Sequence, residues 1–121
     1  MKTVSLITTG VLATLVAVGQ STQKTKNDGE LILDNDKVKI YQYDGSPGKD
    51  VCGLGKHSHP AHLTVLLTDA NVTVTTPDGK VKSDKMKAGT SFWSEAETHT
   101  VINSGTNPIK CQIIELKGQK K

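Results

Sequence analysis

The chain has 121 residues, and 15 basic and 12 acidic side chains give it a formal net charge of +3. This length accommodates one domain with a real hydrophobic core and little more. Every basic side chain is a lysine, because arginine is absent. Recognition of phosphates and base edges depends on the forked guanidinium group, so the mild positive charge indicates a solvated surface and argues against nucleic-acid binding.

Residues 1–19 have the pattern of a secretory signal peptide. Lys2 precedes an uncharged apolar segment, and Ala17 and Gly19 suit the positions before a cleavage point. Cleavage there would make Gln20 the first mature residue and would leave no stable membrane anchor. The alternative is an uncleaved anchor, although the segment is short for a membrane span and is diluted by serine and threonine. We therefore expect a secreted or periplasmic protein.

The rest of the chain divides by composition into three parts. Residues 20–29 are polar, and we expect this spacer to be disordered. We expect the folded domain to cover residues 30–117, and residues 118–121 to form a basic tail.

Short apolar or alternating segments follow one another from Val38 onward, separated by glycine, proline, asparagine and aspartate. Strands are predicted over residues 38–43, 63–68, 72–75, 81–86, 90–94, 98–103 and 109–116. The stretch from Thr76 to Lys80 contains Pro-Asp-Gly, a strong hairpin signal. No segment of the mature chain shows a helical period of useful length. The pattern predicts an all-β domain, a small antiparallel double-sheet jelly-roll barrel.

The four histidines fall into two of these segments. His57, His59 and His62 lie at the head of one apolar run, and His99 lies in a later predicted strand. Successive side chains of a strand point to opposite faces, so His57 and His59 lie on the same face and could coordinate one metal ion. A third ligand must come from another strand, and His99 is the only histidine outside the first stretch. Spacing alone leaves a solvated edge as an equal alternative to a metal site.

These residues resemble the two motifs of a small single-domain cupin. The pair His57-Ser-His59 matches the first motif, and Gly89, His99 and Asn103 match the second. The similarity extends over residues 38–116 and implies a double-sheet β-barrel with a metal site inside. It implies that His57, His59 and His99 bind a divalent transition metal: Zn, Fe, Cu, Ni or Mn.

The chain departs from the family pattern at the fourth ligand. The metal-binding glutamate of the family would fall at Leu63 or Thr64, and neither side chain is a carboxylate. In the second motif Glu95 and Glu97 stand in place of the proline and the glycine. The usual set of three histidines and one glutamate is therefore incomplete.

His62 is the nearest substitute for the missing glutamate. Strict alternation from His59 places Ala61 and Leu63 on the ligand face and His62 on the other face. One extra residue at Pro60 would reverse this facing. The alternatives for His62 are thus a fourth metal ligand and a surface histidine at the mouth of the barrel.

Other side chains near His99 also have two interpretations. Glu97 or Glu95 could hold His99 in one tautomer or act as a general base, or the two could form a solvated pair. Asn103 could donate into the site or serve the fold. Of Phe92 and Trp93, we expect one to plug the barrel and the other to wall a ligand pocket.

Cys52 and Cys111 are the only cysteines. An exported protein meets an oxidising compartment, where the two could form a disulfide. The alternative is a pair of buried small hydrophobic side chains.

Two functions are compatible with these observations. The first is an exported metal-binding cupin that acts on a small-molecule substrate, since three imidazoles leave open positions on the metal: an Fe(II) dioxygenase, or a zinc hydrolase or isomerase. The second is a non-catalytic module that holds a small ligand or a metal. The resemblance also implies a homodimer. Function has to be argued from the site, because this fold hosts many activities.

Overall fold

The computed structural model describes residues 29–118 and contains only β-strands within them. The predicted signal peptide, residues 20–28 of the predicted spacer and residues 119–121 of the predicted tail lie outside the described residues. Within residues 29–118, no helix is long and apolar enough to cross a membrane.

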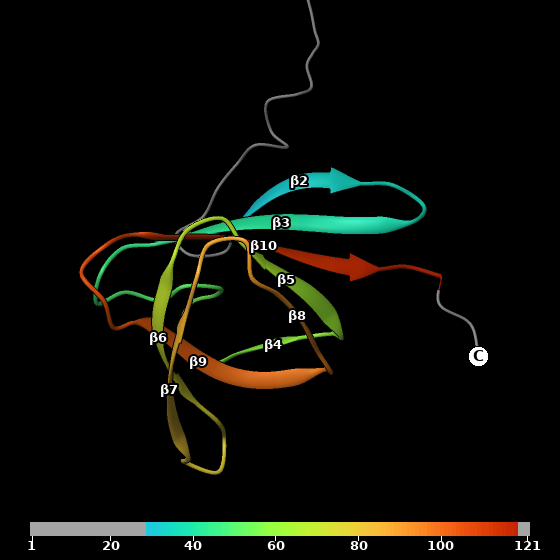
Figure 1. Ribbon diagram of the computed structural model, residues 1–121. Helices are drawn as coiled ribbons and strands as arrows, with labels where there is room; N and C mark the ends of the chain where they lie inside the picture. The colour runs from blue at the N-terminus through green and yellow to red at the C-terminus, as the bar shows by residue number, and fades with distance from the viewer. Residues whose placement is uncertain (1–28, 119–121) are drawn as a thin grey trace, which may run out of the picture.

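Two antiparallel sheets face each other (Figure 1). The five-stranded sheet has the order β2-β3-β10-β5-β8, with β2 (Glu30–Asp34), β3 (Val38–Gly45), β10 (Ile109–Leu116), β5 (His62–Leu66) and β8 (Ser91–Ser94). The four-stranded sheet has the order β4-β9-β6-β7, with β4 (His57–His59), β9 (Glu97–Asn103), β6 (Ala70–Thr75) and β7 (Val81–Met86). The all-β, double-sheet jelly-roll prediction is confirmed.

Most strand boundaries lie within two residues of the sequence prediction, and β7 and β10 coincide with it. Two strands are not among those predicted: β4, although His57 and His59 were expected on one face of an extended segment, and β2. Strand β2 pairs with β3 through a turn at Asn35, whose side-chain oxygen accepts hydrogen bonds from the backbone N–H groups of Lys37 (2.8 Å) and Val38 (2.9 Å). An asparagine that caps its own turn in this way is a hairpin signal.

The predicted hairpin between β6 and β7 is present. The backbone N–H of Gly79 donates to the carbonyl of Thr76 at 2.9 Å, and that of Thr76 donates to the carbonyl of Lys80 at 3.0 Å. Gly79 has a φ of 86°, a left-handed conformation that glycine adopts without steric cost.

The hydrophobic core lies between the two sheets. Alternation along β5 buries His62, Thr64 and Leu66, and alternation along β9 buries His99, Val101 and Asn103. The apolar members of the core are Tyr43, Val51, Cys52, Leu66, Ala70, Val72, Val101, Ile109, Cys111 and Ile113. Each of these two strands therefore carries a histidine on its inner face.

Asn103 serves the fold. Its amide nitrogen donates to the carbonyls of Gly45 (3.0 Å) and Asn107 (2.8 Å), and its side-chain oxygen accepts from the N–H of Gly105 (2.9 Å). With only 1% of its surface exposed, this side chain joins the end of β3 to the turn before β10. The alternative that it donates into the histidine cluster is wrong, because these three bonds occupy its polar atoms.

Candidate metal centre

The pairing of β4 with β9 brings the two histidine-bearing stretches together. His57 lies opposite His99, and His59 lies opposite Glu97. Opposed residues of an antiparallel pair project to the same face, so these four side chains form one group on the inner side of the sheet.

The three predicted ligand histidines lie around a common centre. The ring centroids of His57 and His59 are 4.8 Å apart, those of His57 and His99 are 4.8 Å apart, and those of His59 and His99 are 5.4 Å apart. His59 and His99 are buried, and His57 is half-buried. The structure thus brings together the three histidines that the sequence singled out.

Cys52 completes this group and was not predicted as part of it. Its Sγ lies 3.4 Å from Nε2 of His57 and 3.7 Å from Nε2 of His99. One donor atom from each of Cys52, His57, His59 and His99 lies within 4.8 Å of all the others. The only signal in the sequence was a cysteine five residues before the histidine pair.

The prediction of a disulfide between Cys52 and Cys111 is wrong, and the alternative of two buried cysteines holds. Both side chains are buried and unbonded. Cys111 lies within β10, opposite Tyr43 on β3 and Leu66 on β5. The sulfur of Cys52 instead faces two imidazoles, so the structure holds it as a free thiol.

Two separations from the Cys52 sulfur are close to those of a tetrahedral ion. With metal–sulfur and metal–nitrogen bonds of about 2.3 and 2.0 Å, sulfur and nitrogen ligands of a tetrahedral zinc ion lie about 3.5 Å apart, against about 3.0 Å for neighbouring ligands at right angles. The distances from the Cys52 sulfur to Nε2 of His57 and of His99 are 3.4 and 3.7 Å. The whole group lies within 4.8 Å, so its wider separations would have to shorten around such an ion.

Contacts at the outer nitrogens of two rings leave their Nε2 atoms facing Cys52. Nδ1–H of His57 donates to the carbonyl of Gly55 at 2.8 Å, which leaves the lone pair of Nε2 directed toward Cys52. Nδ1 of His99 lies 3.6 Å from Oε1 of Glu97, and its Nε2 also faces Cys52. Metal-binding histidines characteristically use their second nitrogen in this way.

His59 supplies the strongest local indication of a missing partner. Its Nε2 is buried and has no hydrogen-bond partner among the described residues. A buried polar atom without a partner costs about 1–3 kcal/mol. A metal ion at the centre of the four donors would satisfy it, so the residues present fit such an ion.

Burial favours the neutral, metal-binding form of His59 and of His99. It lowers the pKa of His59 to about 4, with further lowering from the neighbouring rings of His57, His62 and His99. Burial also lowers the pKa of His99, against the opposing effect of the Glu97 carboxylate. The pKa of the Cys52 thiol is raised, chiefly by burial, so a thiolate here requires a cation beside it.

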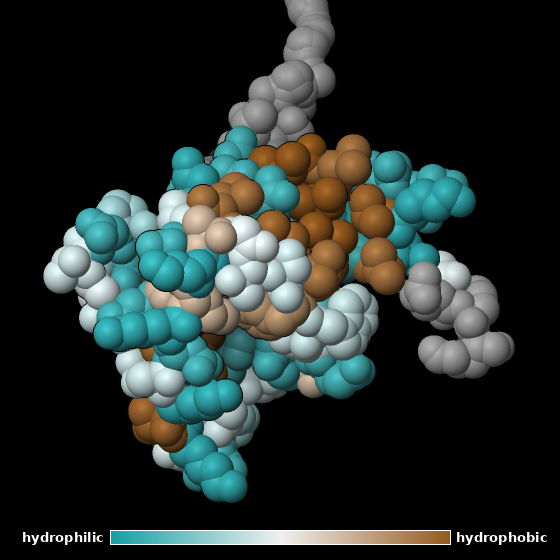
Figure 2. Space-filling view, viewed as in Figure 1, coloured by the Kyte–Doolittle hydropathy of each residue, from teal (hydrophilic) through white to brown (hydrophobic). Residues whose placement is uncertain are grey.

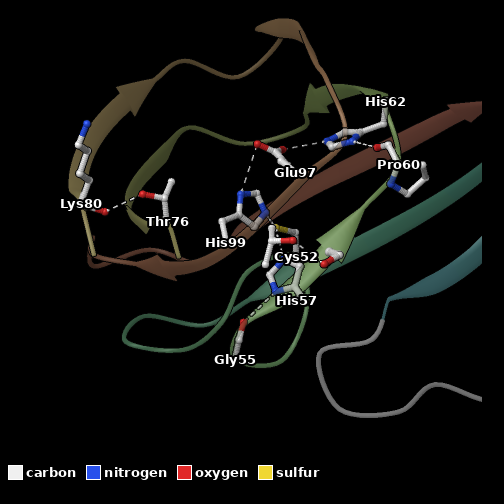
Figure 3. Close-up of polar contacts among 11 residues, drawn as sticks. Cys52, Gly55, His57, Pro60, His62, Thr76, Lys80, Glu97 and His99 are labelled. Carbon is white, nitrogen blue, oxygen red and sulfur yellow. Dashed lines mark hydrogen bonds and ion pairs between the residues drawn. The ribbon is translucent and has the colours of Figure 1, made fainter. Parts of the chain in front are cut away.

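His62 lies next to the four donors but outside the group. Its Nδ1–H donates to the carbonyl of Pro60 at 2.7 Å, and its Nε2 lies 3.7 Å from Oε2 of Glu97 (Figure 3). Only 2% of the residue is exposed, so the surface alternative is wrong. Its inward facing results from a strand break at Pro60 and Ala61, where the chain passes from one sheet to the other and strict alternation ends.

Glu97 lies between the rings of His62 and His99, as Figure 3 shows. The alternative that Glu95 and Glu97 form a solvated pair is therefore wrong for Glu97. Glu95 is exposed, and its Oε2 accepts a hydrogen bond of 2.9 Å from the indole N–H of Trp93. The two neighbouring glutamates thus have separate environments.

Two hollows meet at this group of side chains. A cavity of about 490 Å³ between the sheets is bordered by His99, Glu97 and His62. A second hollow of about 320 Å³ is bordered by His57 and His59. Of the four donors, Cys52 borders both hollows, His99 borders the larger one, and His57 and His59 border the smaller one.

The edge strand β8 forms one wall of the larger cavity. Phe92, which is 37% exposed, borders the cavity, in agreement with the expectation that one aromatic residue walls a pocket. Trp93 lies on the opposite face of the strand and is 47% exposed. The expectation that the other aromatic plugs the barrel is wrong, because alternation along β8 turns Trp93 outward.

Gly53 allows the loop before β4 to pass against the ring of His57. A Cβ at this position would lie 2.6 Å from Cγ of His57, and the φ of 151° is itself unfavourable for other residues. Gly53→Ala should therefore displace the His57 ring or the Cys52 sulfur and weaken zinc binding by about 10- to 100-fold, as is typical when a residue that orients a ligand is lost.

Competition with a chromogenic zinc chelator measures the effect of Gly53→Ala. The matched control is Gly79→Ala in the hairpin between β6 and β7, which places a Cβ in open space at a φ of 86°. It should cost only backbone strain, about 1–2 kcal/mol of stability, and leave the zinc affinity unchanged. Equal zinc affinities for the two variants would contradict this role of Gly53.

No protein-family model matches this chain, and no curated protein matches its sequence significantly. Solved structures do match. A cupin domain from Bordetella pertussis is 26% identical, with a TM-score of 0.66 over 74% of this chain and 92% of the other. An RmlC-like cupin family protein from Methanocaldococcus jannaschii is 13% identical, with a TM-score of 0.59 over 87% and 94% of the two chains.

A conserved Klebsiella pneumoniae protein with a double-stranded β-helix domain is 16% identical, with a TM-score of 0.59 over 88% of this chain and 87% of the other. All three share the arrangement of two facing antiparallel sheets described above. The described part of this chain is therefore a small domain of the cupin superfamily.

Proposed function

We propose that the protein is a metal-binding cupin in which Cys52, His57, His59 and His99 together hold one divalent transition-metal ion. The observation that carries this proposal is the convergence of four donor atoms within 4.8 Å around the unpartnered, buried Nε2 of His59. In this role Cys52 takes the place of the metal-binding glutamate, which is present in the family pattern and absent from this chain.

Four protein donor atoms occupy all four coordination positions of a tetrahedral ion. Sites of this kind are closed and hold metal, whereas catalytic zinc sites keep a position open for water or substrate. We therefore favour a metal-binding module over a metalloenzyme. In such a module the metal lies beside a small-molecule cavity. Among Zn, Fe, Cu, Ni and Mn, a donor set of one thiolate and three imidazoles best suits zinc, whereas manganese prefers oxygen ligands.

A metalloenzyme is the second candidate, and the cavity favours it. The same space borders His99, Glu97 and His62, so a substrate there would reach the metal and two further polar side chains. A bound ion would supply Lewis-acid chemistry, while Glu97 could accept a proton from a substrate. Oxygen consumption or turnover of a small-molecule panel by the metal-loaded protein would favour this second candidate.

Elemental analysis tests the proposed metal site. Protein refolded with each of the five metals, then dialysed, should retain about one equivalent of zinc and less of iron, nickel and manganese. Retention of less than a tenth of an equivalent of every metal would overturn the proposal.

We also propose that the protein is exported, on the strength of the signal-peptide pattern in residues 1–19. N-terminal sequencing of the protein from its natural source should begin at Gln20, in a fraction outside the cytoplasm. Intact Met1 in a cytoplasmic fraction would contradict this.

The outer face of the five-stranded sheet supports the proposal of a homodimer. In register across its five strands lie Leu33, Ile40, Ile114, Leu63 and Trp93. Figure 2 shows hydrophobic side chains gathered where β2, β3 and β10 lie side by side. A solvated sheet face normally carries polar residues, so we expect a second copy to cover this row.

Light scattering tests the dimer. It should give twice the chain mass for the wild type and the single chain mass for Ile114→Lys. A monomeric wild type would contradict the dimer.

A further inference from the structure

We infer that the cavity between the sheets binds a neutral, mainly apolar small molecule whose hydrogen-bond-donating group, such as a hydroxyl, donates to the carboxylate of Glu97 beside His62. The inference rests on the proposed function in one respect, because the charge of the metal centre enters the argument below.

The walls of the cavity are apolar over most of its length. They are formed by side chains from both sheets, among them Leu66, Val72, Val74, Val101, Ile109 and Ile113. Its volume of about 490 Å³ lies in the range of small-molecule sites, which is about 300–1,000 Å³. A ligand that fills it must therefore be largely apolar.

The polar end of the cavity is formed by Glu97 and His62. The Nδ1–H of His62 donates to the carbonyl of Pro60 at 2.7 Å. The two carboxylate oxygens of Glu97 lie 3.7 Å from Nε2 of His62 and 3.6 Å from Nδ1 of His99, beyond hydrogen-bond distance. A carboxylate only accepts hydrogen bonds, so a ligand group that donates one would fill this free acceptor.

Charge selects a neutral ligand over an acid. A divalent ion with one thiolate and three neutral imidazoles keeps one positive charge, which the carboxylate of Glu97 balances. Lys82 and Asp84, which also border the cavity, pair at 3.6 Å where both side chains are exposed to solvent. A ligand carboxylate at Glu97 would meet another carboxylate at close range, and like charges repel.

Hydroxyl groups of Thr64 and Ser94 also border this end. Each can donate or accept, so neither sets the preference.

Three matched probes test the inference at pH 7.5: 4-ethylphenol, ethylbenzene and 4-ethylbenzoate. Titrations followed by two-dimensional NMR give their affinities for the zinc-loaded protein. We expect 4-ethylphenol to bind at least about 10-fold more tightly than ethylbenzene, because a hydrogen bond to a charged group distinguishes them. We expect no binding of 4-ethylbenzoate. Equal binding of the phenol and the benzoate, or no binding of any probe, would overturn the inference.

Two variants test whether Glu97, at the polar end of the cavity, causes the preference for 4-ethylphenol. Glu97→Gln should abolish the preference for 4-ethylphenol over ethylbenzene and leave the binding of ethylbenzene unchanged. The matched control Glu95→Gln removes an exposed carboxylate outside the cavity and should change neither affinity. An unchanged preference in Glu97→Gln would contradict the role of Glu97.

Metal analysis of the same samples separates this inference from the proposed function. If the protein carries no metal but binds 4-ethylphenol in a Glu97-dependent manner, the metal proposal fails and the assignment of the donor group to Glu97 stands. If it carries one equivalent of zinc but shows no preference among the probes, the metal proposal stands and the cavity inference fails.

Discussion

Removal of the metal should lower the melting temperature of the protein by about 15 °C or more. An ion bound only by the folded state stabilises it by about 4 kcal/mol when present at about 1,000 times its dissociation constant. In a domain of this size, each kcal/mol corresponds to about 4–8 °C. Scanning calorimetry of zinc-loaded and chelator-treated protein measures the difference.

A ligand variant and a distant variant control this measurement. His99→Ala should lose most of the difference between the zinc-loaded and the chelator-treated protein, because one of the four donors is removed. Glu95→Gln, which changes an exposed side chain, should keep the full difference. Identical melting temperatures for loaded and chelated wild type would show that the four side chains pack without a metal.

The metal-free protein should also lose stability in mild acid. Folding lowers the pKa of His59 from an ordinary value near 6.5 to about 4, so the folded state favours the neutral ring. The unfolded chain therefore binds the proton more readily, and the contribution of His59 is complete above about pH 6.5 and is lost as the pH falls toward about 4. Urea unfolding of the metal-free protein at pH 7.5 and 5 gives the sign of this effect.

Local patterns predicted most of the fold. Two examples are the Pro-Asp-Gly turn after Thr76 and the alternation of residues 109–116. Each depends only on residues close together in the sequence, and the structure has a hairpin and a strand at these positions. The same holds for His57 and His59, whose common face follows from the period of a strand. The sequence singled out His99 as the only histidine outside the first stretch, but its pairing with His57 spans about 40 residues, and no local pattern predicts such a contact.

The position of Cys52 follows from the path of a loop, which no periodicity encodes. The N–H of Val51 donates to the carbonyl of Val101 at 3.0 Å, and Asp50 forms a bridge with Ile102, so the loop docks along β9. Gly53 then turns the chain closely past His57. His62 was misjudged for a related reason, since Pro60 ends one strand and the next belongs to the other sheet.

Cys52→Ala should weaken zinc binding by about 100-fold or more. Loss of a residue that merely orients a ligand typically costs about 10- to 100-fold, and the loss of a donor atom should cost at least as much. Cys111→Ala is the matched control, because it also removes a buried thiol that borders the cavity. It should cost stability through packing and leave the zinc affinity unchanged.

The pH dependence of zinc affinity distinguishes a bound thiolate from a neighbouring thiol. Burial holds the pKa of the Cys52 thiol well above its ordinary value, so zinc must displace a proton from this sulfur when it binds. Between about pH 7 and 8.5, where the imidazoles are neutral, the affinity of the wild type should rise about tenfold per pH unit. The affinity of Cys52→Ala should be nearly flat over the same range. A wild type as flat as the variant would mean that three histidines bind the ion and that the sulfur of Cys52 only lies beside it.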